Sequence, residues 1–300
     1  MFDKILVTMG LSSHTLSTIP YVRHLAIKFR SELHLLGISS EPQKVWDQSL
    51  IGYVESISNS LKEDNIQTKT NFIYGNPAVE VVKYSDRNGI GLVATTAGSC
   101  NEITTTILNN IAKRMGISVN IPVLMVPIGR SKEVDLLEKV AFLKILVPLD
   151  CSEVGESVLP YVASIAKTLR SSVTLLHVNT PPCRGVPIIH NEVVNISHSA
   201  GRDYVKKACQ RLQCLGIETN YEVIDGTPVK TILKYANQHK VDLIAMGTRC
   251  SSGIDSWIFG NVTNKVSERT TVPVFSVSYP ASGAKGVPVQ IGLEQPLTVK

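Results

Sequence analysis

The chain has 300 residues, about twice the usual size of one domain, so its length favours two domains. Hydrophobic residues make up 43% of it and charged residues 18%, which excludes a disordered or collagen-like chain. The net charge of +5 is spread thinly without a basic block, which argues against a nucleic-acid-binding surface. No apolar run reaches the roughly 18 residues of a membrane span, and no secretion signal opens the chain. We therefore expect a cytoplasmic protein with no nucleic-acid and no membrane partner.

The sequence contains an internal repeat. Residues 4–38 align with residues 144–178 without a gap and are identical at 14 of 35 positions. Farther along, Gly75-Asn76-Pro77 matches Gly226-Thr227-Pro228, and the offset between matching residues has grown from 140 to 151. The two copies are duplicates, and the second carries an insertion of 11 residues after Val178.

Each copy reads as five strands that alternate with helices. In the second copy, short runs rich in β-branched residues predict buried strands at 144–149, 173–178, 219–224, 243–246 and 274–277. Apolar residues from Val229 to Ala236 recur at helical spacing between the third and fourth strands. This alternation predicts an α/β fold with a doubly wound parallel sheet in each copy. Such sheets bind ligands beyond the carboxyl ends of their strands.

Two polar residues near the predicted strands have a structural interpretation. Ser152 matches Ser12 and follows the first strand of the second copy, which favours an N-cap of the next helix. No G-x-S-x-G turn surrounds Ser152, so a nucleophile is not indicated. His177 lies within the second strand, and we expect it to be a packed core residue.

The inserted segment, residues 179–198, contains Cys183, His190 and His198. Their spacings match no zinc pattern, so we expect a flexible loop without a metal. The six cysteines of the chain are dispersed and form no C-x-x-C pair, which favours reduced thiols. Because the segment would lie over the ligand mouth, a lid or a loop that docks a protein partner is one interpretation of it.

The last strand of each copy, at 121–126 and 272–277, has a proline at its second position. A proline near the start of a strand suits an edge strand, whose bare hydrogen-bonding groups invite pairing. We predict that these two edges pair with each other within one chain and make a pseudo-twofold monomer, which other faces could join into a homodimer.

With the motifs KILVPLD at 144–150, LLHV at 175–178 and the run from Met246 to Val274, the chain resembles the universal stress protein family in its tandem two-domain form. The resemblance covers residues 3–280. It implies a Rossmann-like fold of two repeated five-stranded parallel sheets, each with the strand order 3-2-1-4-5, that form a pseudo-dimer. The expected domains are residues 1–138 and 139–280, followed by a flexible tail at 281–300.

Family members that bind ATP carry the motif G-x2-G-x9-G followed by Ser or Thr, an Asp that ends the first strand, and a backbone contact to adenine after the second. The resemblance assigns this site to Asp150, Val178, Gly247, Cys250, Gly260, Asn261 and Val262. Cys250 stands in place of the second glycine, and Asn261 in place of the hydroxyl residue. The amide groups that open the helix after Gly260 would attract a phosphate, and Asp150 would bind the ribose or adenine.

An alternative interpretation makes Gly247 and Gly260 ordinary turn glycines and Asp150 a helix-capping acid. In the first copy the matching positions hold Gly10, Thr96, Ser99, Asn109 and Asn110. Because the acid and the glycines are all missing there, we interpret residues 1–138 as a structural partner that has lost the site.

The expected function is a stress-response protein whose second domain binds an adenine nucleotide, ATP with Mg²⁺, without a dedicated catalytic base. Two alternatives stay open: an interaction module that binds no nucleotide, and a slow ATP hydrolase. The strand order that the resemblance implies would also bring Cys151 and Cys250 to the same mouth. Oxidation of that pair is a further hypothesis for control of ligand binding.

Overall fold

The computed structural model of the chain describes residues 1–9, 13–39, 48–97, 121–128, 140–180, 191–249 and 262–279. The first half of the chain, residues 1–128, contributes β1 (Lys4–Met9), η1 (Ser13–Thr18), α1 (Ile19–Phe29), β2 (Glu32–Ser39), α2 (Gln48–Glu63), β3 (Thr68–Tyr74), α3 (Pro77–Asn88), β4 (Leu92–Ala97) and β5 (Val123–Pro127).

The second half, residues 140–279, repeats this order with one helix lengthened. It contributes β6 (Lys144–Leu149), α5 (Glu153–Glu156), α6 (Leu159–Leu169), β7 (Ser172–Asn179), α7 (Asn191–Cys214), β8 (Thr219–Asp225), α8 (Pro228–His239), β9 (Leu243–Arg249), α9 (Val262–Arg269) and β10 (Val274–Tyr279).

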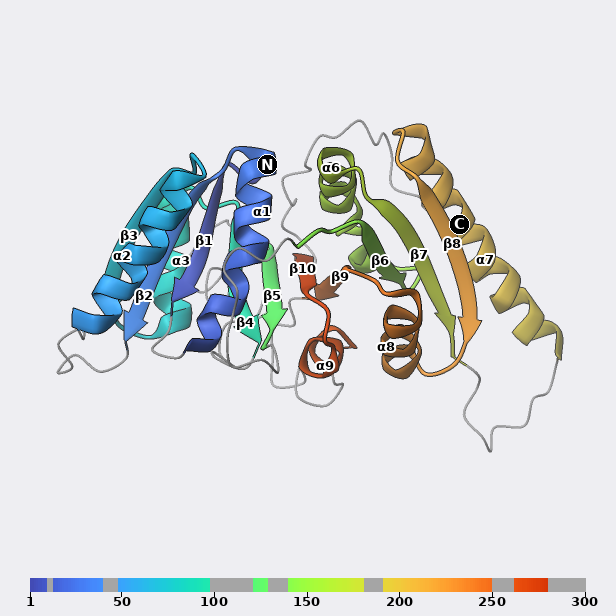
Figure 1. Cartoon of the computed structure of the whole chain (residues 1–300). Coiled ribbons are helices and arrows are strands. Elements are labelled where there is room, and N and C mark those ends of the chain that lie inside the picture. The colour runs from blue at the N-terminus through green and yellow to red at the C-terminus, as the bar shows by residue number, and fades with distance from the viewer. Residues whose placement is uncertain are drawn as a thin grey trace.

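The strands form one ten-stranded sheet in the order β3-β2-β1-β4-β5-β10-β9-β6-β7-β8 (Figure 1). Read within either half, this is the order 3-2-1-4-5, and all pairs within a half are parallel. Helices cover the sheet in both halves (Figure 1). The predicted doubly wound α/β fold is therefore confirmed for both copies.

Matching helices in the two halves begin and end with the same local chemistry. Helices α1 and α6 each carry a proline in the first turn, where its missing N–H leaves no hydrogen bond unmade. Each ends on an arginine in the left-handed conformation, Arg30 with φ 57° and Arg170 with φ 56°, whose N–H bonds back to the helix. The duplication thus preserves helix boundaries as well as strands.

The two halves meet at the edge strands. Strand β5 pairs antiparallel with β10 through Val123 and Ser276, Leu124 and Phe275, and Met125 and Val274. Figure 1 shows these strands side by side at the centre of the molecule. The prediction that the two edges pair within one chain is confirmed.

Aromatic side chains cross the junction reciprocally. Phe2, which precedes β1, lies 6.3 Å from Tyr161 of the second half between ring centroids. Phe142, which occupies the matching place before β6, lies 5.7 Å from Tyr21 of the first half. Both phenylalanines are fully buried in one hydrophobic core that contains residues of both halves. This reciprocity is the packing signature of the pseudo-twofold arrangement.

The expectation of a loop over residues 179–198 is wrong for residues 191–198. Helix α7 begins at Asn191 and runs for 24 residues, so the insertion lengthens a helix at its N-terminal end. Added turns there leave the buried stripe of Val205, Ala208 and Leu212 in place on the sheet. The tail at 281–300 lies outside the described residues. Within the parts of the chain that are described, no helix is both long and apolar enough to cross a membrane.

Candidate functional site

The candidate site lies at the carboxyl ends of β6, β7 and β9. The chain runs from β6 outward to β7 and β8, then returns to β9 on the other side of β6. The point where the strand order reverses is where open α/β sheets hold ligands. Asp150 follows β6, Gly247 lies near the end of β9, and Val178 lies near the end of β7. Cys250, Gly260 and Asn261 lie outside the described residues.

Asp150 has a structural task in addition to its exposed position. Its Oδ1 accepts hydrogen bonds from the Ser152 backbone N–H at 3.2 Å and from the Ser152 hydroxyl at 2.5 Å. The same hydroxyl oxygen accepts from the Gly155 N–H at 3.1 Å, which makes Ser152 the N-cap of α5 as predicted. Because only Oδ1 is engaged in these bonds and the residue is exposed, the carboxylate can still meet a ligand.

Gly247 is required by the approach of α5. A Cβ atom at this position would lie 1.8 Å from the Val154 carbonyl oxygen, far inside van der Waals contact. The glycine therefore lets the backbone of α5 rest directly on β9. The close backbone approach that this glycine permits is made by Val154 of α5.

Val178 lies in the part of β7 that extends beyond the end of β6. The ladder between β6 and β7 ends at Leu149 and His177, whereas the ladder between β7 and β8 continues to Asn179 and Asp225. The Val178 side chain packs against the hydrophobic core on one face of the sheet. Its backbone is thus the part that a ligand beside the end of β6 would meet.

Val262 opens helix α9 next to β9. The hydroxyl of the following residue, Thr263, donates to the Gly247 carbonyl at 3.4 Å. This contact holds the first turn of α9 against the same strand end that carries Gly247. The start of α9, whose first N–H groups have no acceptor within the helix, belongs to the same edge of the sheet as Asp150.

His177 of β7 is hydrogen-bonded to the last residue of β6. Its Nδ1 lies 2.8 Å from the Leu149 carbonyl oxygen, which can only accept, so Nδ1 carries the proton. A Cβ at Gly201 of α7 would lie 2.7 Å from His177 Nε2, so α7 packs directly on the ring. His177 is thus packed and hydrogen-bonded as expected, but it is only half-buried and is not a core residue.

Cys151 adopts the left-handed conformation, with φ 62°, and its Sγ lies 3.7 Å from His177 Nδ1. Desolvation, together with the charges of Asp150 and Glu156, raises the pKa of its thiol to about 11. The thiol therefore stays protonated at neutral pH, which slows oxidation. Its partner in the redox hypothesis, Cys250, lies outside the described residues, so that hypothesis stays a prediction.

One contact at the site gave no signal in the sequence. Arg211 of α7 donates to Glu156 of α5 at 2.9 Å and ties the lengthened helix to the short one that rests on Gly247. The two residues are 55 positions apart, and only the folded arrangement brings them together.

The first half differs at the matching strand end. Thr96 stands where the second half has Gly247, and the segment that matches α5 forms the 3-10 helix η1 instead. A side chain at this position prevents the close approach that Gly247 permits. Gly10, Ser99, Asn109 and Asn110 lie outside the described residues.

Comparison with known proteins agrees with this geometry. The model of the Universal stress protein family (Usp) matches residues 141–278. A universal stress protein of Methanocaldococcus jannaschii is 28% identical over 140 residues, which cover 46% of this chain and 82% of that protein. One of Synechocystis is 35% identical over 80 residues, which cover 27% of this chain and 74% of that protein. The chain belongs to the universal stress protein family.

The fold of a solved family member extends the likeness to both halves. The crystal structure of a universal stress protein from Archaeoglobus fulgidus has a TM-score of 0.63 and is 19% identical, covering 93% of this chain and 99% of that one. At this identity the likeness concerns the fold alone. It shows that the arrangement of two repeats in about 300 residues occurs in another universal stress protein.

Proposed function

We propose that this universal stress protein binds an adenine nucleotide in its second domain, residues 139–280, and that residues 1–138 act as a structural partner without a site. The proposal rests mainly on two features that lie together where the strand order reverses. They are the exposed Asp150 carboxylate and the backbone of β7 beyond the end of β6. A ligand at this edge can meet a charged acceptor and a strand backbone at once.

The nucleotide's parts are assigned by chemistry. Asp150 accepts from ribose hydroxyls or the adenine amine, and the Val178 backbone pairs with the edge of the base. Val262 opens α9, and its N–H group and those of Gly260 and Asn261, which precede it in the sequence, are proposed to bind the phosphates. The motif assigns Cys250 to the same contact. Bound ATP brings Mg²⁺ with its phosphates, and Asp150 is the carboxylate of this edge that could contact such an ion.

Two other functions remain candidates. An interaction module would use the same fold without a nucleotide, with a protein partner or a second copy as its ligand. A slow ATP hydrolase would need only bound ATP, Mg²⁺ and a carboxylate. We favour binding whose output is a change of conformation or partner, in the cytoplasm.

The test is whether the purified protein carries a nucleotide, measured by mass spectrometry after denaturation, followed by calorimetric titration of ATP with Mg²⁺. Asp150→Asn keeps an acceptor oxygen for Ser152 but removes the charge. We expect it to weaken ATP binding about tenfold or more, the usual value of a hydrogen bond to a charged group.

Asp242→Asn is the matched control. Like Asp150, Asp242 accepts two hydrogen bonds on one carboxylate oxygen. They come from the backbone N–H groups of Leu143 at 3.0 Å and Lys144 at 2.9 Å, at the opposite end of the strands. It should leave ATP affinity unchanged. Wild-type protein that neither retains nor binds a nucleotide would favour the interaction module, and release of ADP that Asp150→Asn abolishes would favour the hydrolase.

A further inference from the structure

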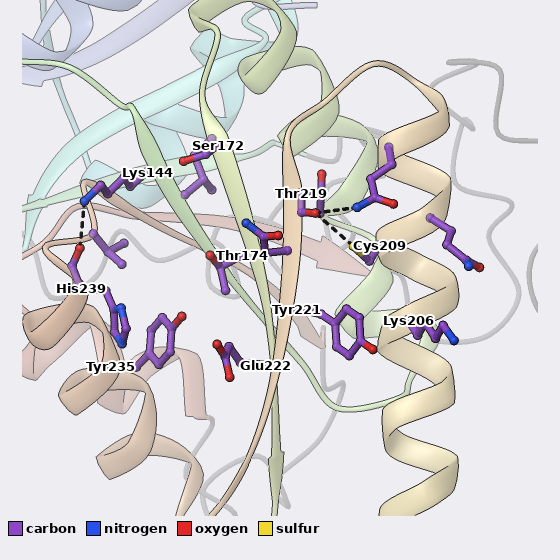
Figure 2. A pocket seen from close by; sticks show the side chains of 15 residues that line it. Lys144, Ser172, Thr174, Lys206, Cys209, Thr219, Tyr221, Glu222, Tyr235 and His239 are labelled. Carbon is purple, nitrogen blue, oxygen red and sulfur yellow. Dashed lines mark hydrogen bonds between the residues drawn. The ribbon is translucent and has the colours of Figure 1, made fainter.

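A hollow lies at the opposite end of the strands from the candidate site. It has a volume of about 590 Å³ and lies around the amino ends of β6, β7 and the edge strand β8. Figure 2 shows its side chains on both sides of β8, with Lys206, Cys209 and Tyr221 toward α7 and Thr174, Glu222 and Tyr235 on the side of α8. The α8 side concerns us here.

In the first half, a cluster of polar side chains occupies the matching positions. His34 is fully buried, and its Nδ1 lies 2.9 Å from the Tyr84 hydroxyl. Asn71 donates to the same hydroxyl at 2.7 Å. The other ring nitrogen of His34, Nε2, lies 3.6 Å from the Glu32 carboxylate. Lys69 Nζ lies 3.0 Å from the same carboxylate.

The strand registers identify which residues replace this network in the second half. His34 pairs with Lys69 and Leu36 with Asn71, just as Thr174 pairs with Asn220 and Leu176 with Glu222. In the second half, Ser172 stands in place of Glu32, Thr174 in place of His34, Asn220 in place of Lys69, Glu222 in place of Asn71 and Tyr235 in place of Tyr84.

The second half therefore lacks the imidazole ring of His34 and the ammonium group of Lys69, and it has the carboxylate of Glu222 instead of an amide. The tyrosine remains as Tyr235, and Thr174 lines the same side of the hollow. Glu222 makes no ion pair with any residue that the structure describes, whereas Glu32 in the first half is paired with Lys69. Glu222 and Tyr235 both line the hollow, and Figure 2 shows their side chains next to each other on the α8 side. Burial and, after it, the charge of Glu222 raise the pKa of Tyr235.

We propose that the α8 side of this hollow binds a small molecule that carries a heteroaromatic ring of the imidazole kind and an ammonium group. The ring takes the place that His34 fills in the first half and hydrogen-bonds to Tyr235. The ammonium pairs with Glu222, as Lys69 pairs with Glu32. This site is independent of the proposed nucleotide site, which lies at the other end of the strands.

The probe is histamine, titrated into the full-length protein at neutral pH and followed by calorimetry and by amide chemical shifts. We expect saturable binding with one site per chain, and shifts at Thr174, Glu222 and Tyr235. Butylammonium, which keeps the charge but lacks the ring, should bind at least tenfold more weakly. Absence of saturable histamine binding up to about 10 mM would overturn the proposal, as would equal affinity for butylammonium.

Variants locate the site. Thr174→His restores the ring of the first half and Thr174→Leu fills the same space without a ring nitrogen; each should reduce affinity at least tenfold. Glu222→Gln should reduce it about tenfold through loss of the charge. Lys206→Gln, on the α7 side of β8, is the control and should leave affinity unchanged. Unchanged affinity in Glu222→Gln, or in both Thr174 variants, would overturn the proposal.

Discussion

At the scale of single residues, the duplication provides its own comparison. Gly247 and Thr96 occupy the same position in the two halves, and the difference of one side chain accompanies a change from α5 to η1 in the segment above it. The glycine is explained by contact with Val154 and needs no ligand to justify it. A glycine of the nucleotide-binding motif can thus serve packing as well as ligand binding.

Gly247→Ala should destabilise the protein. The new Cβ would meet the Val154 carbonyl oxygen at 1.8 Å, so α5 must move away from β9. We expect a loss of about 1–3 kcal/mol or more in the free energy of unfolding, measured by urea denaturation. Gly52→Ala in α2 is the control, because a Cβ there meets nothing within 4 Å. It should be neutral or stabilising by up to about 1 kcal/mol.

His34 should make stability depend on pH. Burial is the largest cause that lowers its pKa below the ordinary value of 6.5, so the unfolded chain binds a proton more readily than the folded one. Stability should therefore fall as the pH drops below about 6.5 and stop falling once the folded-state pKa is passed. His34→Gln, compared by urea denaturation at several pH values, should show a smaller fall over that range. An equal fall would contradict this assignment.

At the scale of elements, helix ends show where the two halves have diverged. Helix α3 ends at Gly89, with φ 64°, and the matching α8 ends at Lys240, with φ 49°. Both residues are exposed and both have the left-handed conformation, which disfavours side chains other than glycine. At this helix end, the second half therefore carries backbone strain that the first half avoids.

Exchange of these two residues should change stability in opposite directions. Lys240→Gly should raise the free energy of unfolding by up to about 1 kcal/mol, and Gly89→Lys should lower it by a similar amount. A Cβ at Gly89 meets nothing within 4 Å, so the second change tests backbone conformation without a clash. Thermal or urea unfolding of both variants measures the effect, and shifts of the same sign would refute the explanation.

At the scale of the whole molecule, the sequence was informative where a pattern repeats locally. The repeat, the β-branched runs and the proline at each last strand predicted the ten strands and the junction of β5 with β10. The start of α7 was missed because the inserted residues have no counterpart in the first half to compare with. The contacts of Gly247 with Val154, and of Arg211 with Glu156, depend on packing between distant segments, which no local pattern encodes.

Phe2→Ala should weaken both halves together. Phe2 is 1% exposed, and its ring packs edge-on against Phe29 at 5.2 Å and Phe275 at 6.0 Å between centroids. Truncation leaves a cavity at the junction, and we expect a loss of about 3–5 kcal/mol in the free energy of unfolding. Phe142→Ala at the reciprocal place should cost a similar amount, while Phe2→Leu should cost less. A loss below about 1 kcal/mol in both alanine variants would contradict a shared core.

The antiparallel pairing of β5 with β10 also has an evolutionary meaning. A homodimer built on the same pairing must carry every substitution twice, once on each side of its axis. Here a single chain supplies both sides, so a mutation alters one side only, and the local concentration of one half around the other does not fall on dilution. His34 is thus buried in one half, while Thr174, at the matching position, lines a hollow in the other. A single chain that carries both sides of the junction can therefore hold different side chains at matching positions of its two halves.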